Sequence, residues 1–215
     1  MHPLPEKFLN YAFRQRRDFL RRFLEGSISE SEFLVAFTRH TPAIISCGRA
    51  GPNGSIKGIG FVQKMKFIED TVKKAEEFLE SVTGLPRGKA MRLALKFLLD
   101  EVYVEEKIDF TKLSSLELAK GHSWANLNEN PRASILFYTP PSISFEVRAK
   151  VEVHERGAYW KYVNAIHDVF HAAGNEKRRD WSKTPAYIFL LEEIYDNSVE
   201  AMGRRIWSVS SDEEG

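Results

Sequence analysis

Apolar residues recur at helical spacing near the start of the chain. Steps of 4, 7 and 4 residues place them on one stripe of a helix predicted over residues 6–25, and Gly26 ends it. The stripe consists of Leu9, Phe13, Leu20 and Leu24. Ser29 and Glu32 then show the spacing of a capping box, which predicts a second short helix that stops before Pro42.

Strand-like patterns follow these helices. Residues 43–47 form a short apolar run, residues 48–54 are rich in turn-forming glycine, and apolar and polar positions alternate over 61–68. We therefore predict a β-hairpin with a long loop over 43–69. Two helices are then predicted over 71–83 and 86–103.

The second half of the chain contains the clearest pattern. After a strand predicted near 108–118 and a short helix over 123–129, a compact apolar strand covers 133–138. Residues 143–154 then alternate between apolar and polar over twelve positions. This strict period of two predicts a long antiparallel strand with one buried face and one wet face.

A periodic apolar helix over 159–173 ends at Gly174, and residues 186–195 form another strand-like run. The polar, acidic residues 208–215 are expected to fray. Helices segregated from antiparallel strands predict an α+β fold, with the sheet closed into a small barrel.

Composition narrows the class of protein. The chain has 215 residues, which fits one decorated domain or two small ones. Its 31 Lys and Arg residues against 30 Asp and Glu residues leave a net charge of +1. This balance excludes a globally basic nucleic-acid-binding chain and an acidic, disordered one.

Cys47 is the single cysteine, so an internal disulfide framework and a multi-cysteine zinc site are excluded. No apolar run approaches the ~20 residues that span a bilayer. The start of the chain lacks the charged-then-apolar pattern of a signal peptide. We therefore expect a cytoplasmic protein with no membrane partner.

Several local patterns have both a functional and a structural interpretation. The six Lys and Arg residues against three acidic ones in residues 1–25 could contact phosphates, but a solvated helix face is the favoured interpretation. His167 and His171 share a helix face and could bind a metal, although no third ligand is evident. Asp168 stands where a zincin motif needs glutamate, so solvated or interface histidines are favoured.

Cys47 could be a nucleophile only beside a basic group or a helix N-terminus, and a buried structural cysteine is favoured. The Gly58-Ile59-Gly60 segment lacks the third glycine of a dinucleotide-binding fingerprint, because Gln63 occupies that place. No Rossmann-type site is therefore expected.

Residues 120–131 combine a loop of basic and hydroxyl side chains with the start of a short helix. A loop with Lys120, His122 and Ser123 leads into a short helix, whose N-terminus can bind phosphate through free N–H groups. On local chemistry alone, an ordinary N-capped helix is the simpler interpretation.

The stretch HSWANLNENPRASILFY (122–138), followed by SFEVRAKVEVHE (144–155), resembles the pyridoxamine 5′-phosphate oxidase-like FMN-binding split-barrel proteins. In that superfamily a hydroxyl-bearing loop precedes a short helix ending in Asn-Pro, and a long strand containing Val-Arg follows. The run AYIFLLEEIYDNS (186–198) is similar to the family's last barrel strand. The resemblance covers about residues 41–200 and is sharpest over 120–155.

The resemblance implies an antiparallel split β-barrel of the six-stranded type. The barrel domain would cover residues 41–207, with a helical insertion at about 71–103. Residues 1–40 would be an N-terminal helical extension, and residues 208–215 a disordered tail.

The resemblance also implies site residues. Ser123 would donate to the flavin phosphate, and His122 stands where lysine or arginine is usual. Glu146 stands where the oxidases proper carry glutamine near the flavin, and Arg148 matches the family's Val-Arg. The full set of implied cofactor-binding residues is Lys120, His122, Ser123, Trp124, Asn126, Glu146 and Arg148.

The implied cofactor is FMN, with FAD, deazaflavin or haem as alternatives bound by relatives of the same fold. Family members are usually homodimers with the flavin between subunits. The function implied is that of an oxidoreductase acting on a small molecule, in which the flavin performs the chemistry. The alternative is a non-catalytic barrel that has lost the flavin or binds another ligand such as haem, with a protein or nucleic-acid partner.

Overall fold

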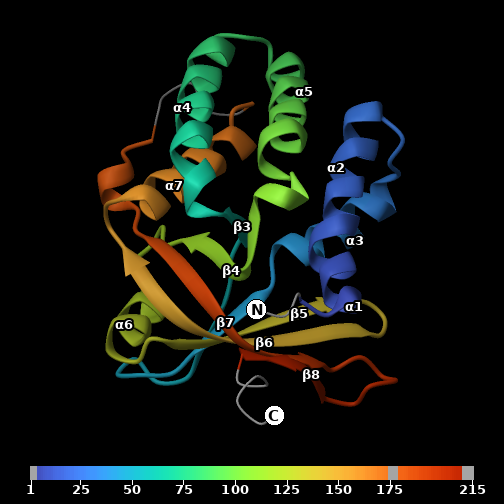
Figure 1. Ribbon diagram of the computed structural model, residues 1–215, viewed down its shortest axis with the longest axis vertical. Helices are drawn as coiled ribbons and strands as arrows, with labels where there is room; N and C mark the ends of the chain where they lie inside the picture. Colours follow the sequence, from blue (N-terminus) through green and yellow to red (C-terminus); the bar gives the residue numbers. More distant parts are fainter. Residues whose placement is uncertain (1–3, 174–178, 210–215) are drawn as a thin grey trace.

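The computed structural model describes residues 4–173 and 179–209. Helices and strands are interspersed along the chain (Figure 1). The helices are α1 (Glu6–Leu9), η1 (Asn10–Arg14), α2 (Gln15–Glu25), α3 (Glu30–His40), α4 (Met65–Val82), α5 (Arg87–Phe97), η2 (Leu98–Val102), η3 (Glu105–Lys107), α6 (His122–Glu129), α7 (Ala158–Phe170) and η4 (Trp181–Lys183). The strands are β1 (Ala43–Ser46), β2 (Asn53–Ile56), β3 (Gly60–Gln63), β4 (Ile108–Leu116), β5 (Arg132–Thr139), β6 (Ile143–His154), β7 (Ala186–Asp196) and β8 (Arg204–Ser208).

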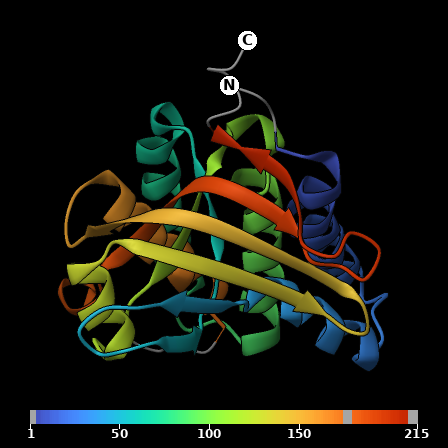
Figure 2. The same cartoon turned by 90° about the horizontal axis from the view of Figure 1, so that it is seen from below.

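All of these strands belong to one antiparallel sheet. Their order is β2-β1-β5-β6-β7-β4-β3, and β8 pairs with β7 outside this path. Figure 2 shows β5, β6 and β7 side by side, with helices behind them. The predicted α+β class is therefore confirmed.

The sheet is curled because its two edges are close in sequence. β2 and β3 are the outermost strands of the path, yet residues 57–59 alone join them. Three linking residues span at most about 14 Å, so the two edges must approach each other at this end. No ladder joins β2 to β3 among the described strands, and the curled sheet therefore keeps a seam. This is the split barrel that the resemblance implied.

The N-terminal helices fill the inner side of the sheet. Phe8 of α1 is fully buried, and its ring centre lies 5.8 Å from that of Phe137 on β5 and 5.4 Å from that of Phe145 on β6. Phe13 of η1 packs edge-on against Phe61 of β3 at 5.1 Å. On another side, α4 packs against α7, which also contacts β3, β4 and β7.

Local signals in the sequence explain several helix boundaries. Ser29 and Glu32 form the predicted capping box at the start of α3. Gly26 ends α2 in the left-handed conformation, with φ of 72°. Pro86 stands immediately before α5. None of the described helices has the length and hydropathy of a membrane-spanning segment.

The strand predicted over 61–68 is wrong beyond Gln63, because α4 begins at Met65. The buried positions of α4 start at Ile68 and continue at helical spacing through Val72 and Ala75. This stripe faces the core. Its helical spacing, and not the alternation over 61–68, determines the structure from Met65 onward.

The predicted pairing of the hairpin is also wrong. β1 pairs with β2, which lies partly inside the predicted loop, whereas β3 pairs with β4. β8 was not predicted. Gly174 as a helix stop lies outside the described residues, as does most of the predicted tail. The division into 1–40 and 41–207 stays a prediction, as does the insertion at 71–103.

Candidate functional site

The implied cofactor-binding residues fall into two separate groups. The first group surrounds the N-terminus of α6, and the second lies on the outer face of β6. The first group consists of Lys120, His122, Ser123, Trp124 and Asn126. The second consists of Glu146 and Arg148.

Ser123 is buried near the start of α6 and faces β2. Its hydroxyl accepts a hydrogen bond from Asn53 Nδ2 at 2.9 Å and lies 2.9 Å from Ser55 Oγ. These contacts fasten α6 to the edge strand. They leave the hydroxyl directed into the protein.

Asn126 is fully buried and holds the turn between β1 and β2. Its Oδ1 accepts the Ala50 amide at 2.9 Å, and its Nδ2 donates to the Gly51 carbonyl at 2.7 Å. Gly48 lies so close that a Cβ there would come within 3.0 Å of the Asn126 Cα. The turn and α6 are therefore packed backbone to backbone.

Lys120 occupies the loop before α6 with a left-handed φ of 49°. Its Nζ lies 4.9 Å from the centre of the Trp124 ring and 3.4 Å from Glu155 Oε1. His122, the first residue of α6, is exposed. The loop thus presents one lysine and one histidine to solvent.

Glu117, which sequence analysis did not identify, shapes this loop. Its Oε1 accepts the amides of Ala119 at 2.9 Å and Lys120 at 2.7 Å. Its Oε2 accepts from Lys57 Nζ at 3.0 Å and Tyr187 OH at 2.9 Å. Lys57 and Tyr187 are 60 and 70 residues away in sequence, so no local pattern could have revealed this cluster.

Burial opposes the ionisation of Glu117. The hydrogen bonds from Lys57, the Ala119 amide and Tyr187 outweigh it and hold the pKa of Glu117 below its ordinary value. Only 2 % of the Glu117 side chain is exposed. A buried, ionised glutamate therefore fixes the loop that leads into α6.

The second group lies on a ladder of polar side chains across the outer face of the sheet. Register places Arg148 between Ser134 of β5 and Glu193 of β7. The Arg148 guanidinium lies 3.0 Å from Glu146 Oε1, 3.3 Å from Glu193 Oε2 and 3.1 Å from Tyr195 OH. It also lies 4.4 Å from the centre of the Tyr195 ring. Arg148 is therefore held in one place by three side chains.

A groove of about 990 Å³ crosses this outer face over β1, β5, β6 and β7. Its volume is that of a small-molecule or cofactor site. Arg132, Arg148 and Lys150 supply positive charge, and Glu192 and Glu193 supply negative charge.

The two groups of implied residues do not meet in this groove. Arg148 is the only member of the set that lines it. Asn130, at the C-terminal end of α6, also lines it, and His122 stands eight residues earlier. At 1.5 Å per residue, the N-terminus of α6 is about 12 Å away along the helix axis.

Cys47 lines the groove and is exposed, so its assignment as a buried structural cysteine is wrong. It follows the last residue of β1, where the alternation of the strand turns Ile45 outward and Ser46 inward. The same alternation carries Cys47 to the outer face.

His167 on α7 and His171, which directly follows the helix, lie together with ring centres 4.4 Å apart. Across the described ranges 4–173 and 179–209, no group of three or more potential ligands is arranged to hold a metal ion. The hypothesis of a helix-based metal centre therefore gains no third ligand from these residues.

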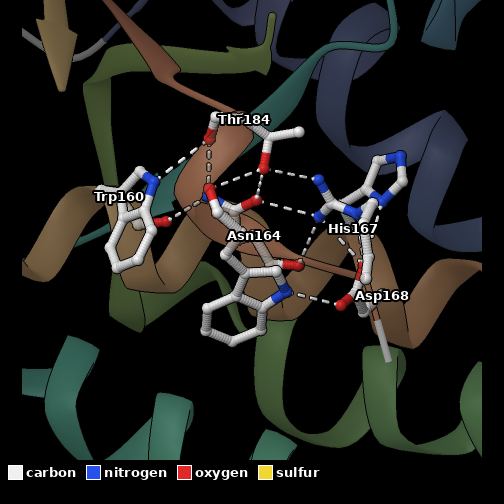
Figure 3. A network of polar contacts seen from close by, with 7 residues as sticks. Trp160, Asn164, His167, Asp168 and Thr184 are labelled. Atoms are coloured by element: carbon white, nitrogen blue, oxygen red, sulfur yellow. Dashed lines mark hydrogen bonds and ion pairs between the residues drawn. The ribbon is translucent and has the colours of Figure 1, made fainter. Parts of the chain in front are cut away.

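A dense polar network next to these histidines ties the segment before β7 to α7 (Figure 3). Asp168 accepts from Arg179 Nη2 at 3.0 Å and from Trp181 Nε1 at 2.7 Å. Asn164 Oδ1 accepts from Thr184 Oγ1 at 2.8 Å and from Arg179 Nη2 at 2.9 Å. These groups satisfy one another, which is typical of a structural network.

No protein-family model matches the chain. No curated protein matches it either.

Several solved structures are similar to the chain. HupZ of Group A Streptococcus is 13% identical, with a TM-score of 0.46, over 84% of this chain and 99% of that one. A candidate pyridoxamine 5′-phosphate oxidase from Listeria innocua is 10% identical, with a TM-score of 0.42, over 84% and 96%. The haem storage protein HutZ of Vibrio cholerae is 13% identical, with a TM-score of 0.41, over 79% and 95%.

The Listeria protein carries the name of the family that the sequence resembles. Identities and TM-scores this low transfer no cofactor, substrate or reaction to this chain.

Replacing Glu117 by glutamine tests the buried carboxylate. We expect Glu117→Gln to lower the free energy of unfolding at pH 7 by about 3 kcal/mol, because Lys57 then lacks its counter-charge in a buried position. The depressed pKa of Glu117 contributes stability above the ordinary glutamate pKa of about 4.3, and this contribution is lost as the pH falls through the folded-state value. The free energy of unfolding should therefore decrease less steeply with falling pH in Glu117→Gln than in the wild type.

Chemical denaturation between pH 7 and pH 3 measures both effects. Glu155→Gln, at a side chain that is 59% exposed, is the matched control and should change stability by less than about 0.5 kcal/mol. Equal stability of Glu117→Gln and the wild type at pH 7 would contradict this account of the loop.

Proposed function

We propose that the protein binds FMN in the groove on the outer face of its sheet and acts as a flavin-dependent oxidoreductase on a small molecule. The groove, lined by an Arg148 that three side chains hold in place, is the observation that carries the proposal. The sequence resemblance over 120–155 supplies the choice of flavin. When bound, the flavin supplies the electron or hydride transfer.

Two neighbouring basic side chains of the groove fit a phosphate group. Arg132 and Lys150 are direct cross-strand neighbours, and both line the groove. Arg132 is paired with Glu192 at 2.9 Å, whereas Lys150 forms no ion pair within the described part of the chain. A phosphate carrying about −1.5 to −2 charge would match the two neighbouring cations together, Lys150 and the Arg132 guanidinium. Arg132 and Lys150 are therefore the residues that would hold the FMN phosphate.

The phosphate anchor implied at α6 fits less well. The Ser123 hydroxyl already contacts Asn53 and Ser55. The remaining donors at this helix end are the N–H groups of its first turn, which has no side-chain cap, and the side chains of Lys120 and His122. We therefore assign the phosphate to the groove and give the α6 cluster a structural role.

Arg148 would face the flavin ring. Its guanidinium is held by Glu146, Glu193 and Tyr195, so its positive charge stays fixed while substrate and product exchange. A charged group that is already in position does not have to reorient during the reaction, so it stabilises developing charge on the flavin effectively. Glu146 reduces this charge, which distinguishes the site from the glutamine-bearing oxidases that the sequence resembles.

We further propose that a second copy of the chain covers this face. Ile45 and Ile56 expose 43% and 68% of their surface on the outer side of β1 and β2, beside the groove. β2 is also an edge strand, and a partner subunit would protect it from other pairings.

Light scattering on the purified protein should give twice the chain mass of 24.7 kDa, and a mass of one chain contradicts this part of the proposal.

A flavin-free binding module remains the second candidate. Two observations favour it: the Ser123 hydroxyl is engaged within the protein, and Glu146 places an anion beside Arg148. Failure to bind any flavin would support this candidate.

Replacing Lys150 by alanine tests the phosphate assignment. We expect Lys150→Ala to weaken FMN binding about tenfold, the usual loss for one charge-assisted hydrogen bond. Riboflavin, which lacks the phosphate, should bind the variant and the wild type within about twofold, because only the phosphate contact is removed. Fluorescence titration with each flavin measures both affinities.

Lys161→Ala is the matched control, since Lys161 is an exposed lysine on α7. It should leave both affinities unchanged. Equal weakening of FMN and riboflavin by Lys150→Ala would show that Lys150 does not hold the phosphate.

A further inference from the structure

Helices α2 and α3 form the two walls of an open groove of about 630 Å³. Figure 1 shows the two helices side by side. Arg22 near the end of α2 lies 2.6 Å from Glu32 near the start of α3 and closes one end of the groove. Phe19, Val35 and Ala36 supply its apolar lining. The groove is separate from the sheet face that carries the proposed flavin site.

Most of the charge in this groove is already neutralised. The charged residues that line it are Arg14, Asp18, Arg22, Glu32 and Arg39. The ion pairs are Arg14–Glu105 at 2.8 Å, Arg22–Glu32 at 2.6 Å and Arg21–Asp18 at 3.8 Å. Four of the five lining charges therefore have a partner of opposite sign.

Arg39 is the exception. It forms no ion pair with any residue that the structure describes, and its buried Nε has no hydrogen-bond partner there. Its guanidinium lies 5.5 Å from the centre of the Tyr11 ring, which stabilises a cation but accepts none of its in-plane N–H bonds. A ligand in the groove cannot reach this buried Nε, but the two Nη atoms are not among the buried unpaired atoms of the described residues, so they are the donors that remain accessible.

We propose that the α2–α3 groove binds a small organic monoanion, a carboxylate with an apolar body. The carboxylate pairs with Arg39, because a planar guanidinium matches a carboxylate in a two-bonded fork. The apolar body lies along Phe19, Val35 and Ala36. One unmatched positive charge favours a monocarboxylate over a phosphate dianion.

The length of the groove sets the size of the ligand. Arg39 and the closing residue Glu32 are seven positions apart on α3, which is about 10 Å along the helix axis. This length suits a medium-chain fatty acid. The volume also lies in the range of small-molecule sites.

Calorimetric titration of the full chain with octanoate tests the proposal. We expect one octanoate to bind each chain, and octan-1-ol and octylamine to bind at least about tenfold more weakly, because neither can pair with Arg39. Arg39→Gln should weaken octanoate binding by about tenfold or more. Arg87→Gln, at an exposed arginine of α5 that does not line the groove, is the matched control and should bind like the wild type.

A second variant guards against a folding defect in Arg39→Gln. Val35 is 40% exposed, so Val35→Glu should fold normally while placing a carboxylate in the groove. It should abolish octanoate binding and leave FMN affinity unchanged. Equal affinity for octanoate and octan-1-ol, no binding at millimolar octanoate, or unchanged binding by Val35→Glu would each overturn the proposal.

Discussion

Three residues, Lys57 to Ile59, join the two edges of the sheet, and each is anchored to a neighbouring element. The Lys57 side chain pairs with Glu117 at 3.0 Å, the Gly58 carbonyl accepts Ser115 Oγ at 2.8 Å, and the Ile59 amide donates to the His40 carbonyl at 2.9 Å. Because this link is short and fixed, the sheet must curl. Its concave side then needs a filling, which the aromatic side chains of the N-terminal helices provide.

Because the sheet is curled, its two faces have different surroundings and carry different kinds of side chain. The inner face is apolar and packed, whereas the outer face carries the ladder in which Arg148 is held by Glu146, Glu193 and Tyr195. Glu117 connects the seam to the loop before α6, since one carboxylate binds both Lys57 and the amide of Lys120. The position of α6 relative to the groove thus depends on the same buried ion pair that fixes the link.

Sequence patterns predicted the elements whose two faces differ most. Residues 143–154 alternate strictly because one face of β6 is packed and the other is wet, and that contrast is visible without a structure. The alternation at 61–68 led to the wrong prediction of a strand over the start of α4, since the buried stripe of that helix begins only at Ile68. No residue of β8 is fully buried, so its sequence lacks the alternation of apolar and polar positions that would have predicted a strand. The candidate site was harder to predict, because the partners of Ser123 lie about 70 residues away and were visible only after folding.

The visible absorption spectrum of the freshly purified protein shows directly whether the protein binds a flavin. Mass spectrometry of whatever heat denaturation releases would identify the chromophore. If the protein binds FMN as proposed, we expect a flavin spectrum and released FMN. A colourless protein that also fails to bind added FMN would contradict it, and the split barrel would then be a scaffold for a different ligand.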